Sequence, residues 1–150
     1  MEYCFYKNNS TLDDVLSHLH RCDLQFEPPL SSQVELNTYA AKIFENAYRY
    51  EAWLDKVLVG LVAVYHSIEH NTGYITYVGV ENRHRKNKIA GTLLNTSINE
   101  AKNQHIESIE LQVSKNNAPA ISLYKKFEFH EIRSDEKSFF MMKKLPPSSS

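Results

Sequence analysis

The chain has 150 residues, which suits one domain and is long enough to bury a core. Apolar residues make up 42% and charged residues 23%, close to the globular average, which excludes an intrinsically disordered chain. Seventeen basic against eighteen acidic residues give a net charge of -1, without the basic excess typical of nucleic-acid binders. We therefore expect no nucleic-acid partner.

The N-terminus, MEYCFYKNN, has neither the basic start nor the apolar run of a signal peptide. No apolar stretch approaches the roughly 20 residues that span a bilayer. Cys4 and Cys22 are the only cysteines, too few for a disulfide framework. We expect a reduced, cytoplasmic protein without a membrane partner, a monomer or homodimer, with one domain over residues 1–145 and a disordered Pro/Ser tail over residues 146–150.

The first third of the chain predicts one strand and two helices. Residues 2–6 are short, aromatic and typical of a strand. The Ser-x-x-Asp pattern at residues 10–13 resembles a capping box and precedes apolar residues at helical spacing, which predicts a helix over residues 12–21. Two successive prolines make residues 26–30 a loop, and a second amphipathic helix is predicted over residues 36–47.

The middle of the chain predicts an antiparallel meander. Strands are expected over residues 48–54, over residues 57–66 and, after a turn at residues 71–73, over residues 74–80. The second of these strands is apolar on both faces, which indicates a central, covered strand.

The last part of the chain predicts two helices and three strands. An apolar stripe indicates a helix over residues 89–101, residues 108–113 alternate as a strand does, and a short capped helix follows Asn117. Two strands close the chain, near residues 127–133 and 137–144. The order β-α-α-β-β-β-α-β-α-β-β defines an α+β fold (α/β three-layer type), with helices packed on a mixed sheet.

The densest chemical feature is the basic stretch at residues 83–88, Arg-His-Arg-Lys-Asn-Lys, between a strand and a helix. The free N–H groups of a helix N-terminus favour anions, and neighbouring cations strengthen that preference. A diphosphate is a natural guest, although position and charge alone are also compatible with a solvated basic loop. About 30 residues later, the segment from Asn117 to Tyr124 is by itself an ordinary capped helix whose tyrosine belongs in the core.

Together, these two segments resemble the signatures of the GNAT superfamily of N-acetyltransferases. The first signature is a strand ending in Val-x-Pro, then Arg/Gln-x-x-Gly-x-Gly/Ala and a helix, and it corresponds here to residues 80–94. The second, Asn-x-x-Ala-x-x-Leu-Tyr and then Gly-Phe, corresponds to residues 117–124 and 128–129. The element order over residues 2–144 is also similar to the family's, so the resemblance implies a GNAT-like, mostly antiparallel sheet flanked by helices.

Three departures from the family pattern stand out. Asn82 and Lys88 replace the usual proline and first glycine of the first signature, and Glu128 replaces the glycine before the phenylalanine of the second. Glycine lets backbone N–H groups approach a phosphate closely, whereas Lys88 adds a side chain that either shifts the loop or contacts a phosphate. Gln112 stands where some members carry a glutamate general base, and glutamine cannot take a proton.

The resemblance implies acetyl-CoA as the acetyl donor. In relatives, backbone groups of the fourth strand hold the pantetheine arm, the helix start holds the pyrophosphate, and the tyrosine faces the sulfur as general acid or as a hydrogen-bond donor to the leaving thiolate. The residues that the resemblance assigns to the cofactor are Val78, Gly79, Val80, Arg85, Lys86, Asn87, Lys88, Ile89, Ala90, Gly91, Asn117 and Tyr124.

The general base is left open by the sequence. Glu110 is the nearest carboxylate on the strand face that carries Gln112, while His66 and Glu27 are further candidates and each is more often structural. A water molecule ordered by Gln112 is an equal alternative. His18, His20 and Cys22 lie close in sequence but lack a fourth ligand, so we expect no metal.

Family acceptors include protein N-termini, lysines, polyamines, aminoglycosides and amino sugars. The loop over residues 23–33 is expected to wall the acceptor site, with Phe26 covering an apolar or sugar face and Glu27 attracting a cationic amine. This favours acetylation of the primary amine of a small molecule, such as an amine or an amino sugar. Acetylation of a protein N-terminus or lysine, or a non-catalytic domain that only binds coenzyme A, are the alternatives.

Overall fold

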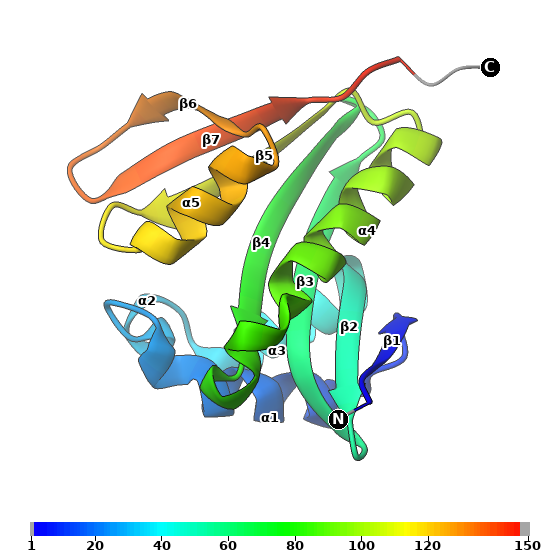
Figure 1. Ribbon diagram of the computed structural model, residues 1–150, viewed down its shortest axis with the longest axis vertical. Coiled ribbons are helices and arrows are strands. Elements are labelled where there is room, and N and C mark those ends of the chain that lie inside the picture. Colours follow the sequence, from blue (N-terminus) through cyan, green and yellow to red (C-terminus); the bar gives the residue numbers. More distant parts are fainter. Residues whose placement is uncertain (1, 148–150) are drawn as a thin grey trace.

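The computed structural model describes residues 2–147, without the side chains of Lys86 and Asn87; the last three residues of the predicted tail lie outside the described residues. The described strands form a seven-stranded sheet of order β1-β2-β3-β4-β5-β7-β6 (Figure 1). The strands are β1 (Cys4–Lys7), β2 (Tyr48–Leu54), β3 (Val57–Ser67), β4 (Thr72–Val80), β5 (Ser108–Ser114), β6 (His130–Ser134) and β7 (Ser138–Lys144). Only the β4–β5 pair is parallel.

Helices cover both faces of the sheet. They are α1 (Leu12–Cys22), α2 (Leu30–Gln33), α3 (Leu36–Asn46), α4 (Ile89–Asn103) and α5 (Ala118–Lys126), with 3₁₀ segments η1 (Asp23–Gln25) and η2 (Asn82–Asn87). In Figure 1, α4 and α5 lie in front of the sheet, and α1 and α3 lie behind it. The predicted α+β fold and its mixed, mostly antiparallel sheet are confirmed.

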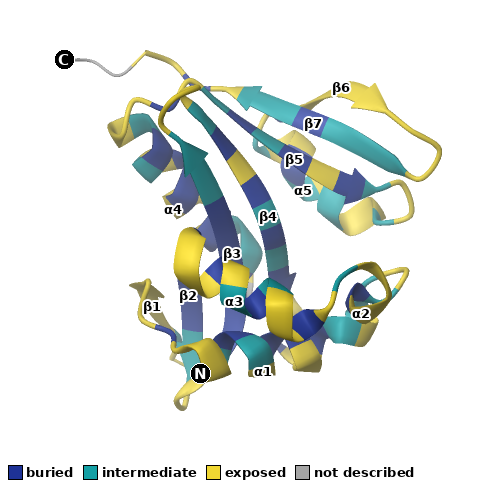
Figure 2. Ribbon diagram, turned by 180° about the vertical axis from the view of Figure 1, so that it is seen from behind, coloured by how far each residue is buried: buried dark blue, intermediate teal, exposed yellow. Residues whose placement is uncertain are grey.

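Two apolar clusters, one on each face, make up the core. Leu58, Leu61 and Ala63 of β3 belong to the cluster under α1 and α3. Val59 and Val62 belong to the cluster under α4 and α5. The prediction that this strand is covered on both faces is confirmed, and burial is deepest along it in the view from behind (Figure 2).

Three local predictions are corrected by the structure. The turn before β4 occupies residues 68–71, so Thr72 and Gly73, expected in the turn, already pair with β3 and β5. The strand after α5 starts at His130 rather than at residue 127, because residues 127–129 complete the end of that helix. The short helix α2 lies within the predicted acceptor loop and was not expected.

The capping box of α1 lies one residue later than predicted. The Thr11 hydroxyl accepts from the N–H of Asp14 at 3.1 Å, and the Asp14 carboxylate accepts from the N–H of Thr11 at 2.8 Å. Ser10, the predicted cap, is already engaged, because its N–H and its hydroxyl both donate to Glu51 of β2. A contact between residues 41 positions apart therefore decides where α1 begins.

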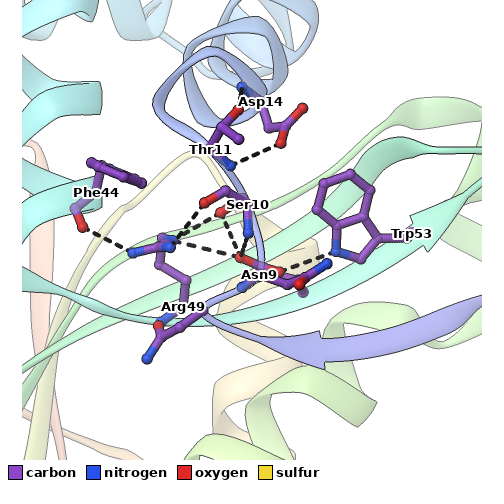
Figure 3. Close-up of polar contacts among 9 residues, drawn as sticks. Asn9, Ser10, Thr11, Asp14, Phe44, Arg49 and Trp53 are labelled. Atoms are coloured by element: carbon purple, nitrogen blue, oxygen red, sulfur yellow. Dashed lines mark hydrogen bonds and ion pairs between the residues drawn. The ribbon is translucent and has the colours of Figure 1, made fainter.

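The carboxylate of Glu51 is fully buried, and the residues that bond to it include Asn9, Ser10 and Trp53, which are labelled in Figure 3. It accepts from the N–H of Asn9 at 3.0 Å, from Ser10, and from the indole N–H of Trp53 at 3.1 Å. The guanidinium of Arg49 lies 3.5 Å away and donates to the hydroxyl and carbonyl of Ser10. This cluster ties the β1–α1 connection to β2.

We predict that Glu51→Gln lowers the free energy of unfolding by about 3 kcal/mol, because the buried Arg49 charge loses its carboxylate. Urea denaturation measures this loss. The matched control is Glu81→Gln, whose partner Arg21 is partly exposed, so that its loss is about 0–1 kcal/mol. Equal losses in the two variants would show that the buried Glu51 carboxylate stabilises the fold no more than the partly exposed Glu81 carboxylate does.

β4 contains one more residue than the β3 segment with which it pairs. Ala63 pairs with Tyr77 and the next residue, Val64, pairs with Ile75, so Thr76 is the extra residue of a β-bulge. Pairing with β5 ends at Ile75, and beyond this point β4 and β5 diverge, as Figure 1 shows. A bulge bends its strand, so the position of Thr76 determines where the sheet opens.

Candidate functional site

A cavity of about 440 Å³ occupies the opening between β4 and β5. Residues 75–80 of β4 and residues 111–114 of β5 form its two long walls, and α5, the start of α4 and the segment from η1 to α3 complete it. Its volume falls in the range of small-molecule sites. The cavity thus gathers residues from both predicted signatures and from the predicted acceptor loop.

The open edge of β4 carries backbone groups that no strand binds. The N–H of Glu81 donates to Val59 of β3, so the carbonyl of Val80, in the same peptide unit, points away from β3. Alternate residues of a strand share a direction, so Val78 also presents its backbone groups to the cavity. Gly79 lies between them, and Val78, Gly79 and Val80, which the resemblance assigns to the pantetheine arm, all line the cavity.

Gly79 is a steric requirement of this wall. A Cβ at Gly79 would lie 2.1 Å from the hydroxyl of Tyr77, whose ring covers the glycine. Tyr77 is held in place because its hydroxyl donates to Nε2 of His18 at 3.0 Å and Nδ1 of His18 donates to the carbonyl of Leu58 at 2.8 Å. Burial lowers the pKa of His18 to about 4, so the neutral imidazole keeps this donor and acceptor pattern.

The basic loop forms η2 and leads directly into α4. Lys88 joins the two with φ 58° and ψ 25°, the left-handed conformation that favours glycine. Among the described side chains none caps α4, and the N–H groups of Ile89, Ala90 and Gly91 have no partner within the helix itself. The Arg85 side chain lines the cavity beside them, while the side chains of Lys86 and Asn87 lie outside the described residues.

The basic loop and the residue before it are bonded to two segments that are distant in the sequence. His84 is buried, and its Nδ1 lies 2.7 Å from the hydroxyl of Tyr3 near the N-terminus. The N–H of Asn82 donates to Oε1 of Gln25 at 2.8 Å, while Nε2 of Gln25 donates to the carbonyl of Val80 at 2.9 Å. A proline at position 82, the usual residue of the family signature, has no N–H for this bond.

Tyr124 lies in the last turn of α5, and its position depends on how that helix ends. Glu128 takes φ 69°, its N–H bonds to the carbonyl of Lys125 at 2.9 Å, and the N–H of Phe129 bonds to that of Tyr124 at 3.0 Å. This is a Schellman motif, and the Phe129 ring completes it by packing 5.9 Å from the Tyr124 ring. Asn117 caps the other end through Ala120, with Oδ1 to N–H at 3.3 Å.

Tyr124 lines the cavity although its side chain is almost fully buried. Burial raises the pKa of its phenol, so it stays protonated at neutral pH. Its hydroxyl makes no hydrogen bond to another described residue. Tyr124 therefore offers a free donor to a ligand in the cavity.

The predicted acceptor residues line the cavity from the segment between η1 and α2. Phe26 packs 5.6 Å from the Tyr77 ring, and Tyr39 of α3 approaches the same ring edge-on at 6.5 Å. The carboxylate of Glu27 is exposed and is the only acid among the described residues that line the cavity. The predicted acceptor wall is thus aromatic, with one exposed negative charge.

The candidate bases on the strands lie in different surroundings. Gln112 lines the cavity and donates from Nε2 to the Ser138 hydroxyl at 3.2 Å. Glu110 lies two residues before Gln112 on β5 and pairs with Tyr74 of β4. It is not among the cavity-lining residues. His66 stacks on Tyr48 with ring centroids 4.5 Å apart, also away from the cavity.

Gln25, Tyr39, Thr76 and Tyr77 are site residues that sequence patterns did not single out. The chain has nine tyrosines, and helical or strand periodicity does not distinguish those that pack from those that line a pocket. Only the bulge and the fold of residues 23–33 bring these residues together.

The remaining sequence features concern metal ligands and membrane-spanning segments. His18 and Cys22 are buried with Nε2 and Sγ 3.8 Å apart, whereas His20 is exposed. Within residues 2–147, no group of three or more His, Cys, Asp or Glu side chains is placed to hold a metal ion. Among the same residues, no helix is both long and apolar enough to cross a bilayer.

Comparison with known proteins identifies the family. A model of the acetyltransferase (GNAT) family matches residues 12–129, well over half of the chain. The chain therefore belongs to the acetyltransferase (GNAT) family, and the resemblance noted in its two signatures is confirmed. This membership classes the chain among the N-acetyltransferases, which are transferase enzymes.

Individual relatives agree with this assignment. An N-alpha-acetyltransferase of Saccharolobus solfataricus is 37% identical over 62 residues, which are 41% of this chain and only 37% of that protein. The PaiA N-acetyltransferase of Thermoplasma acidophilum, solved in complex with coenzyme A, has a TM-score of 0.74 at 16% identity, with 97% of this chain and 100% of that chain covered.

The ribosomal-protein-S18-alanine N-acetyltransferase of Escherichia coli is a further structural neighbour. Its TM-score is 0.77 at 16% identity, with 95% of this chain and 94% of that chain covered. At such identities the structural likeness shows a shared fold.

We predict that Lys88→Gly and Glu128→Gly each raise the free energy of unfolding by about 1 kcal/mol, because both residues hold a left-handed conformation that a Cβ disfavours. Chemical denaturation measures this gain. Lys125→Gly is the control, since position 125 lies inside α5 and glycine there costs about 1 kcal/mol. A loss of stability in Lys88→Gly would contradict the assigned backbone conformation.

Proposed function

We propose that this protein transfers the acetyl group of acetyl-CoA to the primary amine of a small molecule, by direct attack of the amine on the thioester. The proposal rests on one observation: the open edge of β4, the start of α4 and Tyr124 all line the same cavity. Each of these parts suits one part of the cofactor. No metal is required by this chemistry.

The pyrophosphate is proposed to bind at the start of α4, where the N–H groups of Ile89, Ala90 and Gly91 have no partner within the helix and Arg85 adds a positive charge. Lys86, Asn87 and Lys88 complete this loop. The pantetheine arm is proposed to bind the backbone of Val78 and Val80 and the neighbouring helix cap at Asn117. The complex of PaiA with coenzyme A supports this use of the shared fold.

Lys88 is proposed to contact a phosphate as well as to form the turn. The two glycine variants described above separate these effects, because Glu128→Gly relieves the same kind of strain at a site far from the loop in sequence. A weaker affinity for coenzyme A in Lys88→Gly alone supports the contact. Unchanged affinity in both variants would limit Lys88 to a backbone role.

Tyr124 is proposed to stabilise the leaving thiolate by a hydrogen bond. An ordinary phenol, with a pKa near 10, is already a weaker acid than a thiol near 8.5. Burial raises the pKa of Tyr124 further, which makes full proton transfer to the thiolate still less favourable. Donation of a hydrogen bond is therefore the role that this environment supports.

The base is proposed on the acceptor side of the cavity. Gln112 cannot take a proton but is placed to order a water, and Glu110 lies outside the cavity lining. Glu27 is the remaining carboxylate, and Phe26 beside it supplies the apolar surface expected for an amine or amino-sugar acceptor. Glu27 is therefore the group we assign to attract the amine and to accept its proton, directly or through water.

Acetylation of a protein N-terminus is the second candidate. It is favoured by two relatives, because the Saccharolobus solfataricus protein is named an N-alpha-acetyltransferase and the Escherichia coli protein acts on an alanine of ribosomal protein S18. The first match covers 37% of that relative and the second shares 16% identity, so neither extends by itself to the acceptor of this chain.

We predict that acetyl-CoA raises the melting temperature and that thiol is released with at least one small amine. The measurement is thermal shift with acetyl-CoA, followed by thiol release over a panel of polyamines, amino sugars, aminoglycosides and peptides with a free N-terminus. Release with peptides alone selects the second candidate. Binding without release on the whole panel would favour a non-catalytic domain, and no binding would contradict both.

We predict that Tyr124→Phe lowers the turnover number by at least about 10-fold while the affinity for coenzyme A changes little, because only the thiolate contact is lost. Single-turnover kinetics and calorimetric titration measure the two quantities. Since the pKa of Tyr124 is raised, the wild-type rate should show no fall from ionisation of this phenol up to about pH 10. An unchanged turnover number would remove Tyr124 from the reaction.

A further inference from the structure

The edge of β4 that faces the cavity is held at two points by side chains from the segment that walls the acceptor site. The hydroxyl of Tyr39 donates to the carbonyl of Thr76 at 2.7 Å and lies 2.9 Å from the Thr76 hydroxyl. Four residues further along β4, Nε2 of Gln25 donates to the carbonyl of Val80 at 2.9 Å. Between these two points lies Val78, whose backbone groups face the cavity.

We propose that Tyr39 and Gln25 are positioning residues that fix the bulge and the open edge of β4, so that Val78 is held ready for an extended, amide-containing ligand arm. The proposal rests on the proposed function, in which that arm is the pantetheine of coenzyme A. A buried carbonyl without a strand partner needs another donor, and these two side chains supply it.

The geometry favours a role in positioning over one in packing alone. Thr76 is the extra residue of the bulge and has no partner residue on either neighbouring strand, so its carbonyl takes its donor from the Tyr39 side chain. Tyr39 also packs edge-on against Tyr77, so its ring is held while its hydroxyl contacts the bulge. Burial raises the pKa of Tyr39, which keeps the hydroxyl protonated as a donor.

The two positioning residues, Tyr39 and Gln25, differ in one respect. Among the described residues, the Tyr39 hydroxyl bonds to β4 at Thr76 alone, whereas Gln25 also accepts from the N–H of Asn82 at the start of the basic loop. Loss of the Tyr39 hydroxyl therefore affects the pantetheine wall alone. Loss of the Gln25 amide affects both the pantetheine wall and the loop proposed to bind phosphate.

The test compares coenzyme A with adenosine 3′,5′-bisphosphate, a fragment without the pantetheine arm, by calorimetric titration of the full chain. Tyr39→Phe should weaken binding of coenzyme A by about 5-fold to 30-fold and leave binding of the fragment unchanged within about 2-fold. Gln25→Met should weaken binding of coenzyme A by a similar factor.

Matched controls are available in the same chain. Tyr50→Phe removes a buried hydroxyl of β2 that lies beside Glu100 of α4, and Gln33→Met removes an amide that lines the cavity but bonds to Pro28 in its own segment. Both controls should bind coenzyme A as the wild type does. Thermal denaturation of each variant shows whether the fold is retained.

The outcomes separate this proposal from the proposed function. If the wild-type chain does not bind coenzyme A, the proposed function fails. The positioning role of Tyr39 is refuted if the wild type binds coenzyme A and Tyr39→Phe binds both ligands as the wild type does. It is also refuted if Tyr39→Phe weakens the binding of both ligands by the same factor. An effect of Tyr39→Phe on the KM of the amine alone would make Tyr39 an acceptor contact and would also overturn the proposal.

Discussion

The bulge at Thr76 is the constraint on which the site depends. Pairing of β4 with β5 ends at Ile75, the residue directly before the bulge, and the sheet opens from this point. The bulge leaves a row of β4 backbone groups without strand partners, and such groups are costly when buried. Side chains from Tyr39 and Gln25 satisfy two of them, and the remaining groups near Val78 face the cavity.

Two residues of this chain, Lys88 and Glu128, stand where the family signatures have glycine, and both have the same kind of backbone conformation. Lys88 and Glu128 both take a positive φ, and none of the four glycines of the chain does. The chain therefore preserves the backbone path at both positions and accepts a strain of about 1 kcal/mol for each Cβ. At Lys88 the side chain adds a charge beside the proposed phosphate site, whereas at Glu128 the Schellman motif still places Tyr124 at the cavity.

The sequence predicted the elements that depend on local patterns. The meander of β2, β3 and β4 follows from alternation and burial on both faces, and the helix from Asn117 follows from its cap. Alternation does not reveal an extra residue such as Thr76, because one bulge changes the pattern by a single position. The cap of α1 at Thr11 and the role of Tyr39 depend on partners 37 or more residues away, which no local window contains.

The electrostatic arrangement of the cavity gives the proposed reaction a direction. Arg85 and the start of α4 provide the positive charge of the cavity lining, and Glu27 provides the negative charge. Tyr124, kept protonated by burial, suits stabilisation of a thiolate but not removal of a proton from the amine. The proton of the attacking amine must therefore leave toward Glu27 or toward water near Gln112. On this basis we expect the amine to approach from the side of α1 to α3, across the sheet from α4, the helix proposed to bind the diphosphate (Figure 1).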